Sequence, residues 1–152
     1  MLGSIRRIVR LLRQSDRDAE KRTGLSGAQL FVLRELREAG GALTPGELSR
    51  HTLTHQSSVS GVVRRLSDAG YVRRARSPAD GRRVELSLTP SGRAKARRAP
   101  KLAQQQLISA IDLLPAKQRA ALARGLLQLT QEIGIGAEPP PMFFEEGAAV
   151  AK

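Results

Sequence analysis

TPGELSRHTLTHQSSVSGVVRRLSDAGYVRRARSPADGRRVELSL, residues 44–88, is the stretch that decides the fold. It opens with Thr44, Pro45 and Glu47, which combine a capping hydroxyl, a proline at the first helical position and a glutamate three residues after the cap. This combination predicts a short helix over about 45–51. The residues that follow, 52–54, predict a tight turn.

A second helix follows this turn, with Thr54 predicted as its cap and His55 as its first residue. Gly70 is predicted to end it. At helical spacing, one face carries the apolar residues Val59, Val62, Val63 and Leu66. The opposite face carries Ser57, Ser60, Gly61 and Arg64. The pattern predicts a helix that buries one side and presents a polar side.

A β-hairpin is predicted after the second helix. Residues 71–76 and 82–88 have the composition and alternation of strands, and Ser77-Pro78-Ala79-Asp80-Gly81 between them is typical of a turn. Arginines occupy both strands and the turn. Two helices at a tight corner, followed by a basic hairpin, predict a winged helix-turn-helix: the second helix enters the major groove of DNA, and the hairpin lies beside it.

Helices are predicted on both sides of this unit. One spans about 2–22, and a second begins after the capping box of Ser26 and Gln29 and stops before Gly40. Thr89 and Pro90 predict a helix start, and Pro100 predicts a kink or break near 97–99. A final helix is predicted from Pro115, with Leu114 a poor cap. The fold class is therefore mainly α with a small β-hairpin wing.

The composition excludes several classes of function. No cysteine is present, which excludes disulfides, thiolate metal sites and cysteine-based redox sensing. No apolar run would span a membrane, and the arginine-rich start lacks the features of a secretory signal, so we expect a cytoplasmic location. The sequence has no Gly-rich phosphate loop and no triad spacing, which predicts no enzyme and no cofactor.

A metal site is also not expected. Glu47, His51 and His55 are four residues apart, but the predicted turn at 52–54 breaks the helix that would align them. His55 is better explained as a phosphate or base contact.

The charge points to a polyanionic partner. The chain carries 26 Lys and Arg against 14 Asp and Glu, a net charge of +12. A biased genome would also produce an Arg-rich chain, but the charge is concentrated: between Gln56 and Lys101 twelve basic residues face only Asp68, Asp80 and Glu85. This concentration of positive charge in one segment favours nucleic-acid binding.

Several stretches between Leu48 and Arg93 resemble the signature of the MarR family of transcriptional regulators. They are Leu48-Ser49-Arg50, residues 58–66 (SVSGVVRRL), residues 69–74 (AGYVRR), residues 80–84 (DGRRV) and residues 88–93 (LTPSGR). The resemblance implies a single domain over 1–134, with a DNA-binding lobe at about 42–89 and dimerisation helices at about 2–22 and 90–134. Residues 135–152, with three prolines, are predicted to form an extended or mobile tail, and two adjacent phenylalanines, Phe143 and Phe144, suggest docking on an apolar groove.

The resemblance also implies roles for individual residues. Gln56, Ser57, Ser58, Ser60 and Arg64 would face the major groove, Arg82 would enter the minor groove, and Asp80 would orient the wing. Helical spacing agrees for Ser57, Ser60 and Arg64 and is less clear for Ser58. The complete set of expected DNA-binding residues is Thr54, His55, Gln56, Ser57, Ser58, Ser60, Arg64, Arg65, Arg74, Arg76, Asp80, Arg82 and Arg83.

The function that follows is a sequence-specific double-stranded DNA-binding regulator, a repressor that acts as a homodimer on a pseudo-palindromic operator. Family resemblance implies release by a small aromatic or anionic ligand. Three alternatives stay open: a winged-helix DNA-binding protein that senses no small molecule, an architectural or non-specific binder, and an adaptor that uses the basic face for an acidic protein partner.

Overall fold

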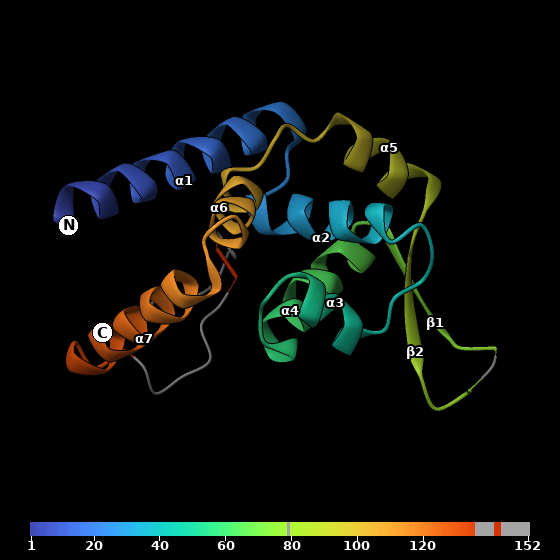
Figure 1. Cartoon of the computed structure of the whole chain (residues 1–152). Helices are drawn as coiled ribbons and strands as arrows, with labels where there is room; N and C mark the ends of the chain where they lie inside the picture. The colour runs from blue at the N-terminus through green and yellow to red at the C-terminus, as the bar shows by residue number, and fades with distance from the viewer. Residues whose placement is uncertain (79, 136–141, 144–152) are drawn as a thin grey trace.

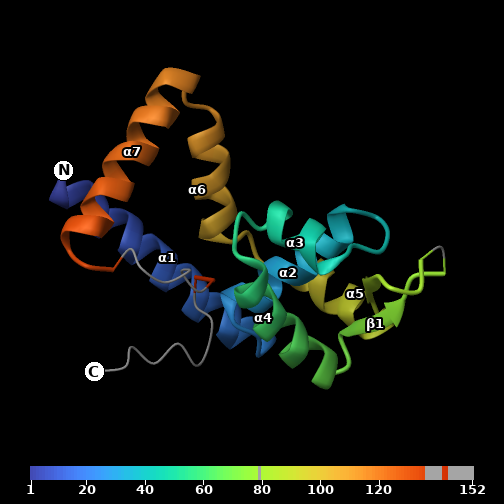
Figure 2. The same ribbon diagram turned by 90° about the horizontal axis from the view of Figure 1, so that it is seen from below.

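The structure, a computed structural model, describes residues 1–78, 80–135 and 142–143. The elements in this part of the chain are α1 (Leu2–Thr23), α2 (Gly27–Glu38), α3 (Pro45–His51), α4 (Gln56–Asp68), β1 (Val72–Arg76), β2 (Val84–Leu88), α5 (Pro90–Arg98), α6 (Ala103–Asp112) and α7 (Ala116–Glu132). Figures 1 and 2 show α1 and α7 extending away on one side, with the β-hairpin at the opposite end. The predicted mainly helical fold with one hairpin is confirmed.

Side-chain caps mark the starts of α2, α3 and α5. Ser26 accepts from the backbone N–H of Gln29 at 3.3 Å, and the Gln29 side chain accepts from the Ser26 N–H at 3.0 Å. Thr44 and Glu47 repeat this capping box at α3, and the Thr89 hydroxyl accepts from the Gly92 N–H at the start of α5. Each box satisfies backbone donors that a helix start otherwise leaves unpaired.

Two predicted boundaries are corrected. Thr54 does not cap α4: His55 holds the cap position without a side-chain hydrogen bond, and the Thr54 hydroxyl donates to the Thr52 carbonyl at 2.9 Å. The last helix begins at Ala116, with Pro115 as its cap, one residue later than predicted.

Pro100 produces a complete break between two helices. Because proline disfavours helical backbone at the residue before it, Ala99 takes an extended conformation with φ −60° and ψ 130°. The predicted break is therefore confirmed, and α6 starts at Ala103 as a separate helix.

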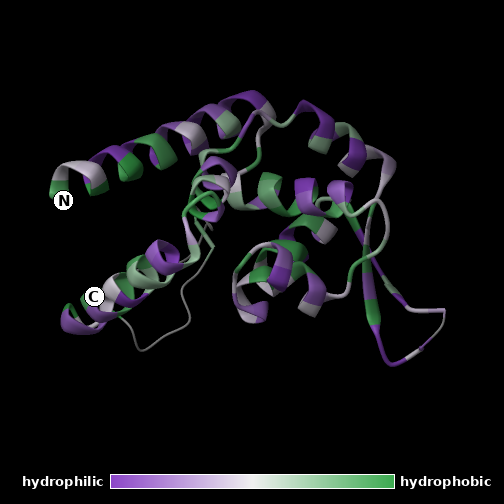
Figure 3. Ribbon diagram, in the orientation of Figure 1, coloured by the Kyte–Doolittle hydropathy of each residue, from purple (hydrophilic) through white to green (hydrophobic). Residues whose placement is uncertain are grey.

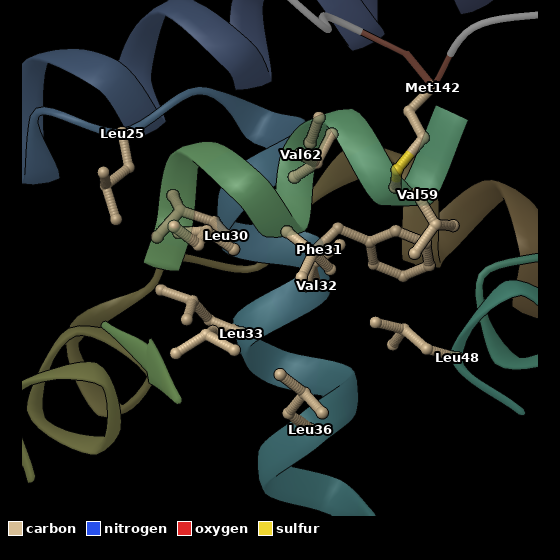
Figure 4. Close-up of a cluster of buried hydrophobic side chains, with 14 of the residues drawn as sticks. Leu25, Leu30, Phe31, Val32, Leu33, Leu36, Leu48, Val59, Val62 and Met142 are labelled. Carbon is tan, nitrogen blue, oxygen red and sulfur yellow. The ribbon is translucent and has the colours of Figure 1, made fainter. Parts of the chain in front are cut away.

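The core lies between α2 and the winged unit, which comprises α3, α4, β1 and β2 (residues 44–88). Leu30, Phe31, Val32 and Leu33 of α2 are at most 1% exposed, so this helix is buried on several sides. Around it pack apolar side chains of the other elements, including Leu48, Val59, Val62, Val63, Leu66, Val72, Leu86, Ala96 and Leu102 (Figure 4). Full burial of each large apolar side chain stabilises the fold by about 1.5–3 kcal/mol.

The outer parts of the fold bury little. Along α1 only Leu12, Ala19 and Thr23 are buried, and α7 has no buried residue among those described. Figure 3 shows apolar segments on both helices where they extend away from the winged unit. Polar contacts hold the inner half of α1, since the Asp16 carboxylate accepts from the Gly27 N–H at 2.6 Å and the Ser15 hydroxyl accepts from the Ala103 N–H at 3.0 Å.

One apolar side chain from beyond α7 joins the core. Met142 is 3% exposed and belongs to the main cluster, whereas Phe143 is 48% exposed. Of the two phenylalanines predicted to dock, Phe143 is therefore half exposed, and Phe144 lies outside the described residues.

Candidate nucleic-acid interface

The corner between α3 and α4 is built by hydrogen bonds to backbone carbonyls and by one unusual residue. The Thr52 hydroxyl donates to the Leu48 carbonyl at 2.9 Å, and the Thr54 N–H donates to the Ser49 carbonyl at 3.0 Å. Leu53 turns the chain with φ +51°, the only positive φ of a non-glycine residue in the described part of the chain. Leucine rarely adopts this conformation, so the tertiary context imposes it.

This corner aims the polar face of α4 outward. Val59, Val62 and Leu66 are fully buried against the core, so the opposite side of the helix faces solvent. The exposed residues of the expected set on α4 and at its start are His55, Gln56, Ser57, Ser60 and Arg64. Their exposure is what groove contact requires.

Other residues of the expected set are less accessible. Ser58 and Arg65 are half-buried at the flank of α4, and Thr54 is half-buried in the corner. Ser60 is exposed, but its hydroxyl donates to the Gln56 carbonyl at 2.8 Å. Its proton is used within the helix, and its oxygen still accepts from outside.

The hairpin forms the expected wing. Its strands pair antiparallel from Val72 opposite Leu88 to Arg76 opposite Val84. Beyond the paired residues, the Ser77 N–H donates to the Arg83 carbonyl at 2.9 Å and the Arg83 N–H to the Asp80 carbonyl at 2.9 Å. These bonds close the turn. The arginines Arg73, Arg74 and Arg76 on β1 are all exposed.

Asp80 separates the roles of the two arginines in the turn. Its carboxylate accepts from the Arg82 backbone N–H at 3.1 Å and lies 3.5 Å from Nε of Arg83. Both arginines are exposed, but among the described residues Arg82 has no ion-pair partner. Arg83 is thus partly neutralised, and Arg82 keeps its charge available to an external anion.

A hollow of about 490 Å³ brings the helix and the wing together. Its lining includes the first turn of α3, Gln56 of α4 and Arg83 of the wing. Glu47 also lines it. Hydrogen bonds from the Thr44 N–H at 2.7 Å and the Thr44 hydroxyl at 2.8 Å hold the pKa of the Glu47 carboxyl below its usual value, and Arg50 and Arg83 lower it further. This carboxylate therefore stays ionised, and its role is to cap α3 through Thr44.

Two residues at this surface were missed by sequence reasoning. Arg50 and Leu53 line a shallow hollow together with Thr54 and His55 at the N-terminus of α4. Both are exposed, and Leu53 is 71% exposed. The exposed position of Arg50 near the end of α3 was readable from helical spacing, whereas no sequence signal marks the left-handed backbone of Leu53.

The described residues were also searched for a metal site and for a membrane-spanning helix. No three His, Cys, Asp or Glu side chains in these ranges gather as a metal ion would require. His51 instead lies 3.7 Å from the carboxylate of Glu35. Within the same ranges, no helix has both the length and the apolar character of a membrane span.

A polar recognition helix at a two-helix corner, beside an arginine-tipped hairpin, defines a winged helix-turn-helix DNA-binding protein. The sequence model of the MarR family matches residues 23–83. The chain is 32% identical over 123 residues to the HTH-type transcriptional repressor Rv2887 of Mycobacterium tuberculosis, covering 81% of this chain and 88% of the relative. The chain therefore belongs to the MarR family of transcriptional regulators, which are not enzymes.

Solved structures agree with this assignment. BpsR of Bordetella bronchiseptica, whose DNA binding is regulated by 6-hydroxynicotinic acid, has a TM-score of 0.56 and 30% identity, covering 84% of this chain and 88% of its own. A mutant of MarR from E. coli, complexed with operator DNA, has a TM-score of 0.55 and 27% identity, covering 82% and 91%. Both share the described architecture over most of their length.

Proposed function

We propose that this protein is a homodimeric repressor that binds a pseudo-palindromic double-stranded DNA operator in a sequence-specific manner. One observation carries the proposal. The valine stripe of α4 is buried, so Gln56, Ser57 and Arg64 are exposed on a helix beside a wing whose Arg82 has no ion-pair partner among the described residues. Readout of base edges needs the exposed polar helix face, and insertion into the minor groove needs the wing arginine beside it.

The proposed contacts divide by element. On α4, Gln56, Ser57, Ser58, Ser60 and Arg64 face the major groove, and Arg64 has the forked donor geometry that guanine accepts. Phosphate contacts come from Thr54 and His55 at the start of the helix, from Arg65, and from the wing arginines Arg74, Arg76 and Arg83. Arg82 enters the minor groove while Asp80 holds its backbone.

The dimer is proposed from the incomplete burial of α1 and α7. Leu122, Leu126 and Leu129 of α7 and Ile133 at its C-cap are 41–60% exposed, and Ile5, Ile8 and Val9 of α1 are 38–40% exposed. Most of the stability of a helix in a protein comes from the packing of its apolar face. A second copy would cover both faces, with residues 1–134 as one domain, a DNA-binding lobe at about 42–89 and dimerisation helices at about 2–22 and 90–134.

Regulation by a small molecule is proposed from the relatives. BpsR, 30% identical, is regulated by 6-hydroxynicotinic acid, which supports release of this protein by a small aromatic or anionic compound. Such a compound acts only by binding the DNA-competent and DNA-incompetent arrangements of the dimer unequally.

Selection of duplexes from a random pool by the purified full-length protein tests the proposal. We expect a pseudo-palindromic site with half-site centres about 34 Å apart, one helical turn of DNA. Arg64→Ala should cost about 1–3 kcal/mol on this site and relax the choice of one base pair in each half-site. Arg82→Ala should weaken binding more evenly across sequences and reduce its salt dependence.

A matched control is Arg97→Ala, which removes the same charge from exposed α5 and should leave sequence preference unchanged. A pool of survivors without a common sequence would instead favour an architectural binder. If the protein retards no duplex at low salt, the interface serves an acidic protein partner. If compounds related to 6-hydroxynicotinic acid fail to release the selected duplex, the protein is a DNA-binding regulator without this kind of sensing.

A further inference from the structure

Lys95 of α5 is a basic residue that the proposed DNA contacts leave unused. It belongs to the stretch in which positive charge is concentrated, but its side chain contacts the protein itself. The ammonium Nζ donates to the Thr23 carbonyl at 2.5 Å and lies 5.7 Å from the centroid of the Tyr71 ring. Lys95 is half-buried, so one cation serves two partners that come from different parts of the same chain.

The first partner is the last residue of α1. A helix leaves its final carbonyl groups without an intrahelical donor, and the helix dipole favours a cation at this end. Thr23 ends α1, and Gly24 turns the chain away with φ 70°. The Thr23 hydroxyl donates to the Ala19 carbonyl at 2.7 Å. Lys95 supplies a donor to the Thr23 carbonyl from 72 residues further along the chain.

The second partner lies where the recognition helix ends and the hairpin begins. The Tyr71 N–H donates to the Leu66 carbonyl of α4 at 2.9 Å, and the Tyr71 carbonyl accepts from the Thr89 N–H at 3.1 Å. The face of the Tyr71 ring attracts the Lys95 ammonium through its quadrupole. Tyr71 is therefore held by α4 on one side and by the base of the wing on the other.

These two contacts join parts of the fold that α2 otherwise connects. Helix α1 packs on α2 and α6, whereas α5 packs on α2 and β2. Figure 1 shows α5 between the end of α1 and the hairpin. Lys95 does not belong to the hydrophobic core cluster. Loss of its charge should therefore leave the core in place and loosen the angle between α1 and the junction of α4 with β1.

We propose that Lys95 is a positioning residue for DNA binding: it holds the end of α1 against the junction of α4 and the wing, and so orients the recognition helix relative to the dimerisation helices. The inference rests on the proposed dimer. In a dimer built on α1 and α7, the angle between each α1 and its own α4 sets the separation of the two recognition helices. Lys95 therefore narrows the range of half-site spacings that the protein accepts.

A direct phosphate contact by Lys95 would leave a different trace. A lysine that neutralises a phosphate contributes to affinity and to its salt dependence regardless of sequence. Its loss would lower affinity by a similar factor at every half-site spacing. A positioning residue instead changes the preference between spacings, so the two roles of this charge are separable.

The test uses the operator selected above, with its half-sites moved apart or together by one and two base pairs. Each added pair shifts a half-site by about 3.4 Å and rotates it by about 35°. The wild-type protein should bind one spacing best. Lys95→Met keeps a long apolar side chain and removes the charge and the donor. In this full-length variant the affinity ratio between the best spacing and its neighbours should fall by about fivefold or more, in the range of typical couplings between sites.

Two variants serve as controls. Arg98→Met removes the same charge from an exposed position on the same helix and should leave the spacing preference unchanged. Tyr71→Phe keeps the ring face on which Lys95 lies and should also keep the preference. If Lys95→Met changes affinity by the same factor at every spacing, as Arg98→Met does, the positioning role is overturned.

A spectroscopic measurement on the free protein separates this inference from the proposed function. The chain contains one tyrosine and no tryptophan, so the tyrosine band in near-ultraviolet circular dichroism comes from Tyr71 alone. Lys95→Met should weaken this band, and Arg98→Met should leave it unchanged. An unchanged band in Lys95→Met overturns the contact whatever the protein binds. If the wild-type protein binds no duplex while the band still responds, the proposed function fails and the positioning role fails with it, but the contact stands.

Discussion

Substituting Gly92 should destabilise the junction between the wing and α5. Gly92 is buried in the first turn of α5, and a Cβ atom placed there would lie 2.0 Å from the carbonyl oxygen of Tyr71 and 2.9 Å from its carbonyl carbon. Its φ is not in the left-handed region. Glycine is therefore required here for space and not for backbone conformation.

Neither side of this contact moves easily. The Thr89 N–H and hydroxyl donate to the same Tyr71 carbonyl at 3.1 and 3.2 Å, and the Thr89 hydroxyl accepts from the Gly92 N–H at 3.0 Å. Restoring ordinary contact requires α5 and the start of β1 to separate by more than 1 Å. Overpacking costs typically 1–3 kcal/mol, and because both partners are backbone we expect Gly92→Ala to cost about 3 kcal/mol. For a chain of this size the melting temperature should fall by about 6–12 °C.

Urea unfolding followed by helical circular dichroism, at a fixed protomer concentration, measures this effect. The control is Gly41→Ala, because a Cβ at exposed Gly41 would meet nothing within 4 Å; we expect a change within about 0.5 kcal/mol. Without the clash, Gly92→Ala would gain helix propensity and stabilise the protein by up to about 1 kcal/mol. A variant as stable as the wild type, or more stable, would refute the close approach.

Three further predictions concern charge, capping and assembly. Burial and the nearby Glu38 raise the pKa of the Glu35 carboxyl above its usual value, so the free energy of unfolding should fall as pH rises through that raised pKa. Glu35→Gln should be more stable than the wild type at pH 7, and the difference should vanish near pH 4. Urea titrations at a series of pH values measure this. Thr44→Ala removes the cap that accepts from the Glu47 N–H at 3.2 Å and should lower the free energy of unfolding by about 1 kcal/mol in the same assay. Unchanged stability would mean that water replaces the cap fully. Leu126→Asp places a charge on the apolar face of α7, where Leu126 is 49% exposed, and should shift the protein toward monomer in sedimentation velocity; an unchanged dimer would remove α7 from the interface.

The winged unit could be predicted because its sequence carries its own boundary signals. Capping boxes, prolines at the first helical position and the valine stripe of α4 are local features, and each acts within one or two turns. The break before Pro100 is local in the same sense. For these elements sequence and structure agree to within one or two residues.

The corner before α4 was predicted only in part, because competing local hydrogen bonds decide it. Thr54 is a good cap by residue type, but threonine hydroxyls also bond to nearby carbonyls in turns. Once Leu53 adopts a left-handed backbone, the Thr54 hydroxyl reaches the Thr52 carbonyl and His55 takes the cap position. Leucine carries no preference for that conformation, so no local feature indicates this geometry.

Met142 could not be predicted for a different reason. Its burial comes from a contact with Val59 and Phe31, more than eighty residues earlier in the chain, and no periodic pattern surrounds it. The nearby phenylalanines looked like the better candidates for docking because aromatic residues are rare in this chain, at 3%.

The two parts of the molecule are therefore stabilised by different means. The winged unit buries its apolar side chains within one chain, so we expect its packing to depend little on protein concentration. The apolar faces of α1 and α7 lie largely outside that core, and in the proposed dimer their burial depends on the second copy. In that dimer, formation of these helices and assembly are one coupled step.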